Sequence, residues 1–248
     1  MKALEIKNLY KYFGGIQAIH DLSMNLDEGI KKAIIGPNGA GKTTLFNIIN
    51  GLLPATSGKI SLFGRDITHM SIHQRTQLGL ARSFQTTRLL FELSLLDNIM
   101  LAIQGTQSSR FGLFRPVMGY SHIVAKAQKL LELVDLWEKR NEMVLNIAHG
   151  EQRKMEIALS LASEPRLLLL DEPASGLTTS ERAEIAQLIL RLTENRTILI
   201  VDHDMDLVFN ISDRILVLHY GKIISEGTPD EIRANERVME IYLGGGED

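Results

Sequence analysis

The 248-residue sequence predicts an α/β fold in which short buried strands alternate with longer helical segments. Continuous apolar runs at 33–35, 167–170 and 197–201 are typical of strands that are buried on both faces of a sheet. The segment 22–26 alternates apolar with polar residues, which indicates a half-exposed strand of an antiparallel sheet. We therefore predict a core built on a mixed sheet, with an antiparallel β subdomain beside it.

The remaining periodic segments predict helices and one hairpin. The stretches 214–219 and 222–225 flank Tyr220 and Gly221, a pattern typical of two antiparallel strands joined by a tight turn. Helices are predicted at 42–50, 150–162, 180–192 and 229–234.

The middle of the chain differs from both ends. From about Leu89 to Asn146 there are no buried-strand runs, and the pattern is mostly helical. The stretch 104–119 is rich in Gly, Ser, Arg and Phe and predicts a loop. We expect one domain over 1–248, with 1–88 and 147–248 as the α/β core and 89–146 as an inserted helical subdomain. Its expected apolar face consists of Ile123, Leu130, Leu131, Val134 and Leu136.

Composition excludes several classes of protein. The 27 basic and 30 acidic residues give a net charge of −3, which disfavours a general nucleic-acid binder. The absence of cysteine excludes disulfide scaffolds and thiolate zinc sites. The N-terminus has no apolar signal region and no stretch approaches 18 apolar residues. We expect a cytosolic protein that reaches a membrane only through a partner.

A phosphate-binding loop follows the first buried strand. The pattern G-x-x-x-x-G-K-[ST] begins at position 36, directly before a predicted helix, and this context argues against a chance glycine-rich turn. The glycines let backbone N–H groups close around phosphate oxygens. Lys42 can reach the β- and γ-phosphates, and Thr43 offers a hydroxyl to Mg²⁺. The loop and helix start comprise Gly36, Pro37, Asn38, Gly39, Ala40, Gly41, Lys42, Thr43 and Thr44.

Two acidic residues follow the buried run at 167–170. Asp171 ends that strand, where it can hold Mg²⁺ through water beside the phosphate loop. Glu172 comes next, where a carboxylate could polarise the attacking water as a general base. Alone, this pattern could also be a strand that enters a solvated turn.

With these two motifs, the chain resembles the nucleotide-binding subunit of an ABC transporter over essentially its whole length. The resemblance implies a P-loop ATPase with ATP and Mg²⁺ as cofactors. It implies that Phe13 stacks on adenine, although the ring could instead pack within the antiparallel sheet. It also implies that Gln85 touches Mg²⁺ and that His203 contacts the γ-phosphate.

The signature segment of that family is altered here. In place of Leu-Ser-Gly-Gly-Gln, the chain has Ile147 and then the residues 148–151. The resemblance implies that these four residues bind the nucleotide held by an opposite subunit. Gly150 and the helix dipole are retained, so binding in trans would rest on backbone N–H groups, with help from His149. Thr178 also stands where an aspartate is common. The four residues are Ala148, His149, Gly150 and Glu151.

Three stretches resemble the ATPases of branched-chain amino-acid importers: 81–89 with 92–98, the segment 148–152, and the end at 238–244. This resemblance implies import of branched-chain or other hydrophobic amino acids. A urea importer or a lipopolysaccharide or lipid exporter remains an alternative. The implied partners are a second ATP-binding subunit (identical or paralogous), integral membrane permease subunits and a periplasmic or extracellular solute-binding protein, but no nucleic acid. The implied location is the cytoplasmic face of the inner membrane.

Other functions remain to be separated from transport. Leu89, Leu90 and Phe91 could form the surface that couples the ATPase to a permease, or they could fill the core of the helical subdomain. An ABC protein acting on ribosomes or DNA usually carries two ATPase cores or long coiled coils, and this chain has one phosphate loop. A regulatory module that binds ATP without hydrolysis would not need Glu172 and His203.

Overall fold

The structure is a computed structural model that describes residues 1–83, 89–106, 121–192 and 196–243. At its centre is a six-stranded sheet with the order β10-β9-β3-β8-β7-β6. β9 and β10 form an antiparallel hairpin, and every other neighbouring pair is parallel, so the predicted mixed sheet and hairpin are confirmed. The strands are β3 (Lys31–Ile35), β6 (Leu80–Arg82), β7 (Leu167–Asp171), β8 (Thr197–Val201), β9 (Arg214–His219) and β10 (Lys222–Gly227).

The register of this sheet brings three strand ends together. Val201 of β8 pairs with Ile34 of β3 on one side and with Asp171 of β7 on the other. The carboxyl ends of the three parallel strands therefore lie next to one another. The loops that follow them leave the sheet at the same edge, where open α/β sheets bind their ligands.

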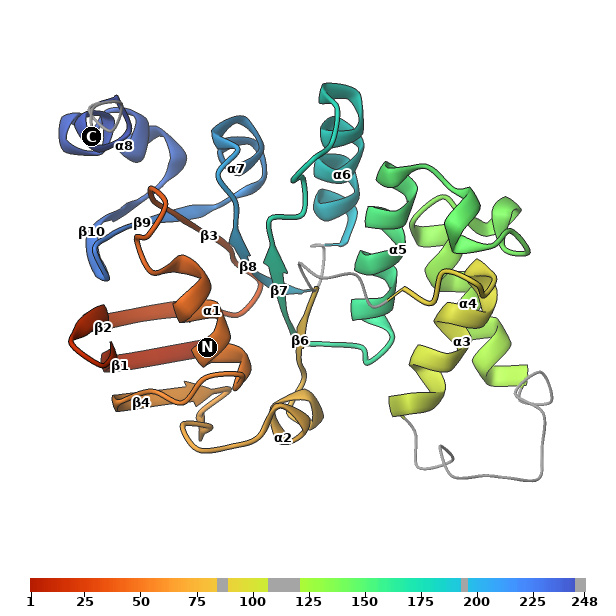
Figure 1. Ribbon diagram of the computed structural model, residues 1–248, viewed down its shortest axis with the longest axis horizontal. Coiled ribbons are helices and arrows are strands. Elements are labelled where there is room, and N and C mark those ends of the chain that lie inside the picture. The colour runs from red at the N-terminus through yellow and green to blue at the C-terminus, as the bar shows by residue number, and fades with distance from the viewer. Residues whose placement is uncertain (84–88, 107–120, 193–195, 244–248) are drawn as a thin grey trace.

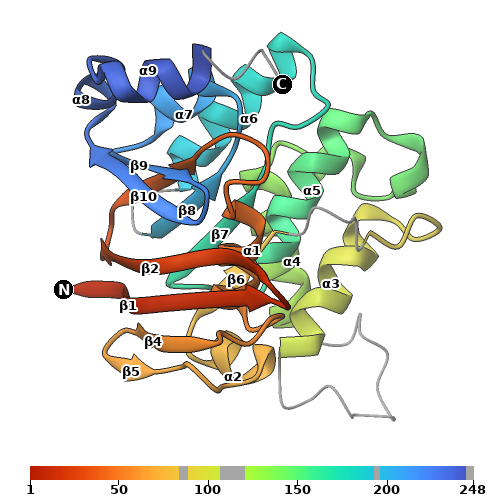
Figure 2. The same cartoon turned by 60° about the vertical axis from the view of Figure 1, so that its left-hand side comes forward.

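A second, antiparallel sheet lies beside the first, as the sequence predicted. Its order is β2-β1-β4-β5, and the half-exposed strand expected at 22–26 is part of β2, with Leu22, Met24 and Leu26 buried. The strands are β1 (Lys2–Phe13), β2 (Ile16–Asp27), β4 (Ser57–Leu62) and β5 (Arg65–Asp66). Figure 2 shows this sheet close to the N-terminal helix α1, which spans Lys42–Asn50 as predicted.

Two apolar clusters cover the two faces of the six-stranded sheet. Ile34 belongs to the cluster that α1 and the antiparallel sheet share, whereas its neighbours Ala33 and Ile35 belong to the other cluster. This alternation follows from the period of two in a strand. The second cluster contains buried residues of α5 (His149–Leu161), α6 (Thr179–Leu192) and α7 (Met205–Ile211).

The described residues of the middle segment are mostly helical, as predicted. It contains α3 (Leu95–Thr106), α4 (Ser121–Leu133) and two short 3₁₀ turns at Trp137–Lys139 and Val144–Asn146. The five predicted core residues of this segment are buried and pack in one cluster with α5. Figure 1 shows α3 and α4 at the opposite end of the molecule from β1 and β2.

The loop predicted from Gln104 does not begin at that residue. α3 continues through Thr106, whose Oγ1 donates to the carbonyl of Ile103 at 2.7 Å. Gln104, Gly105 and Thr106 are helical, and the remainder of the predicted loop, 107–119, lies outside the described residues.

The described residues include three further short helices. These are α2 (Ile72–Gln77), α8 (Pro229–Arg233) and α9 (Glu236–Leu243). Within the described part of the chain, no helix combines the length and the apolar character that crossing a membrane requires.

Candidate active site

The phosphate loop connects β3 to α1 and depends on two glycines. A Cβ added at Gly36 would lie 2.1 Å from the carbonyl oxygen of Leu218. A Cβ at Gly41 would lie 2.7 Å from the carbonyl oxygen of Ala18, and Gly41 has a φ of 104°. Contacts this short exclude a side chain at either position. The loop can therefore pass close to neighbouring backbone on both sides before α1 begins at Lys42.

Lys42 is buried within the loop that it follows. Its Nζ donates to the carbonyl oxygens of Gly36 at 2.6 Å and Pro37 at 2.9 Å. Burial lowers the pKa of Lys42, and the charge of Glu172 opposes that shift. A buried ammonium held by neutral carbonyl oxygens would be stabilised by an anion. Thr43, the next residue, is exposed in the first turn of α1.

The turn of the β9–β10 hairpin braces this loop. The Gly221 amide donates to the carbonyl oxygen of Ala40 at 2.9 Å, and the Gly221 carbonyl accepts from the His20 amide of β2 at 2.9 Å. These bonds tie the phosphate loop to both sheets. The sequence predicted the hairpin but carried no signal for this contact, because the bonded atoms belong to the backbone.

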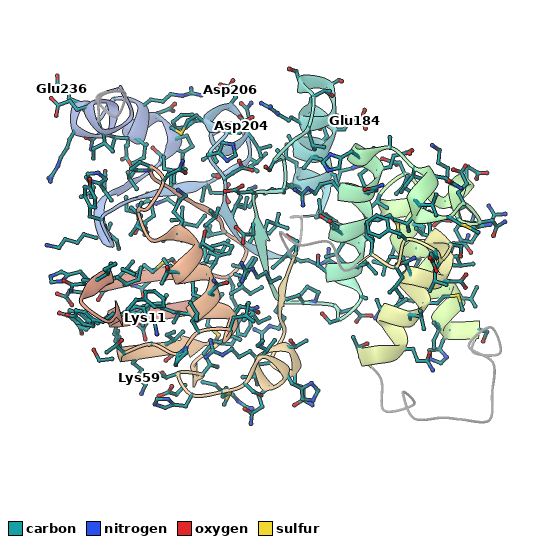
Figure 3. The ribbon with its side chains drawn as sticks, in the orientation of Figure 1. Lys11, Lys59, Glu184, Asp204, Asp206 and Glu236 are labelled. Atoms are coloured by element: carbon teal, nitrogen blue, oxygen red, sulfur yellow. The ribbon has the colours of Figure 1, made fainter. Side chains whose placement is uncertain are left out.

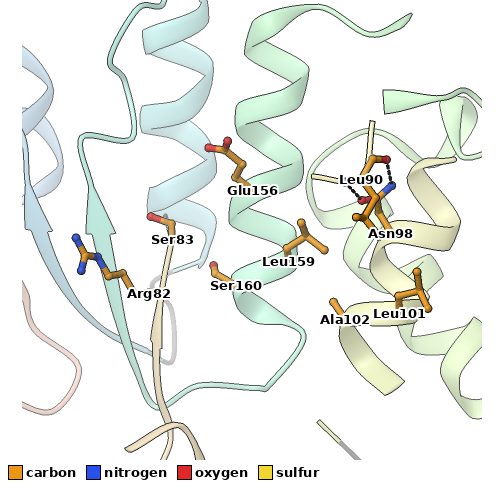
Figure 4. A pocket seen from close by; sticks show the side chains of 9 residues that line it. All are labelled: Arg82, Ser83, Leu90, Asn98, Leu101, Ala102, Glu156, Leu159 and Ser160. Carbon is orange, nitrogen blue, oxygen red and sulfur yellow. Dashed lines mark hydrogen bonds between the residues drawn. The ribbon is translucent and has the colours of Figure 1, made fainter. Parts of the chain in front are cut away.

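Asp171, at the end of β7, forms a buried ion pair with Arg82. The Arg82 guanidinium, which extends toward β7 in Figure 4, donates to Oδ2 of Asp171. It also donates to Oδ1 of Asn47 in α1 at 2.7 Å. The two charged side chains are only 5% and 2% exposed. Arg82 was not predicted as a site residue, because it lies 89 positions before its partner and only the pairing of β6 with β7 joins them.

Glu172 and His203 lie next to each other after β7 and β8. Glu172 has a φ of 46°, and its amide donates to the carbonyl oxygen of Val201 at 2.7 Å. The His203 Nδ1 lies 3.9 Å from Oε1 of Glu172. A left-handed conformation outside glycine costs about 1–2 kcal/mol.

Asp202 links the two loops that carry Glu172 and His203. It is 1% exposed, and its carboxylate accepts from the amides of His203, Asp204 and Ala174. Burial raises its pKa, and the three amide donors oppose that shift. Asp202 was not predicted as a site residue. Its role in holding both loops was missed, because three amide donors cannot be seen in a sequence pattern.

The residues of the signature segment start α5. Ala148 is the N-cap, and its amide donates to Oε2 of Glu151 at 3.1 Å. Glu151 also forms an ion pair with Lys139 at 2.8 Å, so its carboxylate has two partners within this chain. Ala148 and His149 are exposed, whereas Gly150 is buried. α5 and α1 pack in different apolar clusters, on opposite faces of the six-stranded sheet.

Two further predicted residues are Phe13 and Gln85. Phe13 ends β1 with 45% of its side chain exposed, so it is not a core residue of the antiparallel sheet. The Lys11 ammonium lies 4.9 Å from the centroid of the Phe13 ring. Gln85 lies outside the described residues, so its predicted contact with Mg²⁺ stays a prediction.

Comparisons with known proteins agree with this geometry. The family model for the ABC transporter matches residues 19–175, and the model for the branched-chain amino acid ATP-binding cassette transporter matches residues 222–248. The chain is 39% identical to the high-affinity branched-chain amino acid transport ATP-binding protein LivG of Salmonella typhimurium, with 97% of each chain covered. It is also 39% identical to the corresponding protein BraF of Pseudomonas aeruginosa, again with 97% coverage of both.

Solved structures are similar as well. The ADP conformation of an ATP-binding cassette from an ABC transporter is 31% identical, with a TM-score of 0.87 over 98% of this chain and 99% of that chain. A dimeric, post-hydrolysis ATP-binding cassette bound to ADP and Pi is 26% identical, with a TM-score of 0.76 over 91% of this chain and 98% of that chain. The fold, the phosphate loop and these matches identify the chain as a member of the ABC transporter ATP-binding family, a nucleotide-binding ATPase.

Proposed function

We propose that this ATPase powers the import of branched-chain amino acids. The observation that carries the proposal is the full-length similarity to LivG and BraF, whose names state this transport. The match of residues 222–248 to a branched-chain transporter model supports it independently, because that segment lies outside the general ABC match.

The proposed chemistry uses the groups at the edge of the sheet. Backbone N–H groups of the phosphate loop and Lys42 bind the phosphates, and Phe13 stacks on the adenine. Glu172 takes a proton from water as that water attacks the γ-phosphorus, the bond to the β-phosphate oxygen breaks, and His203 holds the transferred phosphoryl group. The 3.9 Å separation of His203 and Glu172 supports a shared task for the two side chains.

The residues present fit a Mg²⁺ ion that arrives with the nucleotide. Among the described residues, no group of three or more His, Asp or Glu side chains forms a ready metal site. The exposed Thr43 hydroxyl, the Asp171 carboxylate acting through water, and Gln85 from outside the described part would complete the shell that the phosphates begin. Bound there, Mg²⁺ would neutralise charge on the phosphate oxygens.

A second ATP-binding subunit completes each site in this proposal. The α5 segment starting at Ala148 would face nucleotide held by the partner subunit, either an identical chain or a paralogue. The separate packing of α1 and α5 and the dimeric relative bound to ADP and Pi support this arrangement.

The permease would dock beside the helical segment. Leu89 is 5% exposed and belongs to the core, whereas Leu90 and Phe91 are 50% and 43% exposed. Leu90 lines a pocket of about 340 Å³ between β6, α3 and α5, with Leu101 and Ser160 also in its lining (Figure 4). A short apolar segment of a cytoplasmic permease loop matches this surface. A solute-binding protein on the far side of the membrane would deliver the amino acid.

Docking can be tested with one double variant. Replacing Leu90 and Phe91 with aspartate should abolish co-purification with the permease while the isolated subunit keeps its ATPase activity. Leu52 is 46% exposed at the end of α1, and Leu52→Asp is the matched control that should leave co-purification intact. Unchanged co-purification of the double variant would contradict docking at this surface.

Uptake of labelled leucine, isoleucine and valine by source cells tests the transported solute. Cells that carry only the Glu172→Gln form should lose this uptake. If those cells showed full uptake while the purified wild-type chain still hydrolysed ATP, the amino-acid substrate would be excluded. The assignment of the chain as an ATPase would stand. Urea uptake and lipid export would then be measured in the same strains.

A further inference from the structure

Glu181 lies in the first turn of α6 and caps that helix. Its Oε2 accepts from the Thr178 amide at 2.9 Å and from the Thr178 hydroxyl at 2.7 Å. The Glu181 amide donates back to the Thr178 hydroxyl at 3.4 Å. This reciprocal arrangement is a capping box, and it accounts for one of the two carboxylate oxygens.

The second oxygen of Glu181 faces the start of α5. A Cβ added at Gly150 would lie 2.6 Å from Oε1 of Glu181, so that oxygen fills the space beside the Gly150 backbone. Two bonds from Thr178 lower the pKa of Glu181, and a hydrogen bond from the Gly150 amide adds to that effect. One carboxylate thus bridges the first turns of α5 and α6.

The Gly150 amide needs an acceptor from outside its own helix. It is the second amide of α5, so no carbonyl within the helix can reach it. The usual acceptor is a side-chain oxygen of the N-cap residue, but the N-cap is Ala148. Glu181 supplies the missing oxygen together with a negative charge, which the positive end of the helix dipole favours.

The His149 ring also lies near the loop that precedes α6. A Cβ added at Gly176 would lie 3.4 Å from Cε1 of His149. Gly176 belongs to the short loop between Glu172 and α6, and the Ser175 amide in that loop donates to the Glu172 carbonyl at 3.1 Å. The start of α5 is therefore connected through Glu181 and Gly176 to the loop that carries Glu172.

We propose that Glu181 is a positioning residue that holds the start of α5 in the separated subunit and releases it when the partner's nucleotide arrives. This inference rests on the proposed pairing of two ATP-binding subunits. The Glu181 carboxylate occupies the position that a phosphate oxygen would take at the Gly150 amide. It must therefore leave that amide as the two subunits close around the nucleotide. When the Glu181 carboxylate leaves the Gly150 amide, the loop after Glu172 is no longer held against the start of α5. Closure of the two subunits is thereby coupled to the positioning of the loop after Glu172.

Two controls separate this role from helix capping and from tethering of α5. Glu231 forms the same capping box with Thr228 at the start of α8, where its Oε2 accepts from the Thr228 amide at 2.7 Å. Glu184, labelled on α6 in Figure 3, pairs with Lys154 of α5 at 2.6 Å without contacting the start of that helix. Glu231→Gln and Glu184→Gln are therefore the matched controls for Glu181→Gln.

The first measurement is amide hydrogen exchange of the nucleotide-free wild-type chain and its variants. Exchange at Gly150 should speed up in Glu181→Gln and remain at the wild-type rate in both controls. Equal exchange in all four proteins would overturn the inference without touching the proposed pairing of subunits.

The second measurement is ATP-dependent dimerisation in the Glu172→Gln background, followed by analytical ultracentrifugation. Adding Glu181→Gln should tighten the dimer roughly tenfold, because a charge that competes for a helix terminus is removed. The two controls should leave the dimer constant unchanged. A dimer that is unchanged or weakened by Glu181→Gln would overturn the inference. No dimer in the Glu172→Gln chain, alone or with its paralogue, would contradict the proposed pairing itself.

Discussion

The buried ion pair between Arg82 and Asp171 allows the sharpest prediction on stability. Replacing Arg82 with methionine keeps most of the apolar volume of the side chain and removes its charge. Asp171 would then be a carboxylate that is 2% exposed, without the guanidinium that now donates to it. Removing one partner of a buried pair costs about 3–5 kcal/mol. That is a large share of the ~5–15 kcal/mol that holds a typical domain folded.

Equilibrium unfolding in urea, without nucleotide and with a chelator, measures this loss. The double variant Arg82→Met with Asp171→Asn should recover most of the stability, because a neutral amide replaces the unpaired charge. Arg166→Met is the matched control. Arg166 is 55% exposed and lies 3.2 Å from Glu28, so its loss should cost less than about 1 kcal/mol.

Two results would refute this reasoning. One is a loss below about 1 kcal/mol for Arg82→Met, which would mean that the pair behaves like an exposed one. The other is a double variant that is no more stable than the single one. In that case the cost would come from packing rather than from the unpaired charge.

Three other changes have defined outcomes. Gly36→Ala should abolish ATP binding, measured by fluorescent-nucleotide titration, because its Cβ would lie 2.1 Å from the Leu218 carbonyl oxygen. Burial lowers the pKa of Lys42, so the folded chain binds fewer protons than the unfolded chain between the two pKa values, and stability rises with pH there. Lys42→Met should remove that rise in alkaline urea titrations while it also weakens ATP binding. The Thr68 hydroxyl and amide lower the pKa of Asp66 to about 2 from 3.8, so its stabilising effect is present above pH 3.8 and is lost as the pH falls toward 2. Asp66→Asn should therefore be less stable than wild type at neutral pH, and the difference should shrink across that acidic window.

Each of these expectations has a contrary result. Normal ATP affinity in Gly36→Ala would show that the loop can move away from β9. A Lys42→Met chain with the wild-type dependence of stability on alkaline pH would assign that dependence to another group. A difference between Asp66→Asn and wild type that stays constant from neutral pH to pH 2 would exclude ionisation of Asp66 as its cause.

The sequence predicted those elements whose signal is local. The phosphate loop, the three buried strands and α1 follow from residues that are contiguous in the chain, and α1 has the predicted bounds. β6 was not predicted, because three residues are too few for a periodic pattern. β1 was not predicted either, since register shifts along its pairing with β2 interrupt the alternation of buried and exposed residues.

Parts of the site that depend on tertiary contacts could not be predicted. Asp171 could be named from the apolar run before it, but its partner Arg82 reaches it only through the pairing of β6 with β7. The Thr178 and Glu181 pattern could have been found as a capping box. The contact of Glu181 with Gly150 could not, because it depends on how α5 packs against α6.

Single-turnover ATP hydrolysis by the purified chain, with and without Glu172→Gln, tests the central claim most directly. The account predicts that the wild-type chain releases phosphate, and that the Glu172→Gln chain binds ATP with similar affinity but retains it uncleaved. Phosphate release by Glu172→Gln at the wild-type rate would contradict the account, because another group would then have to activate the water.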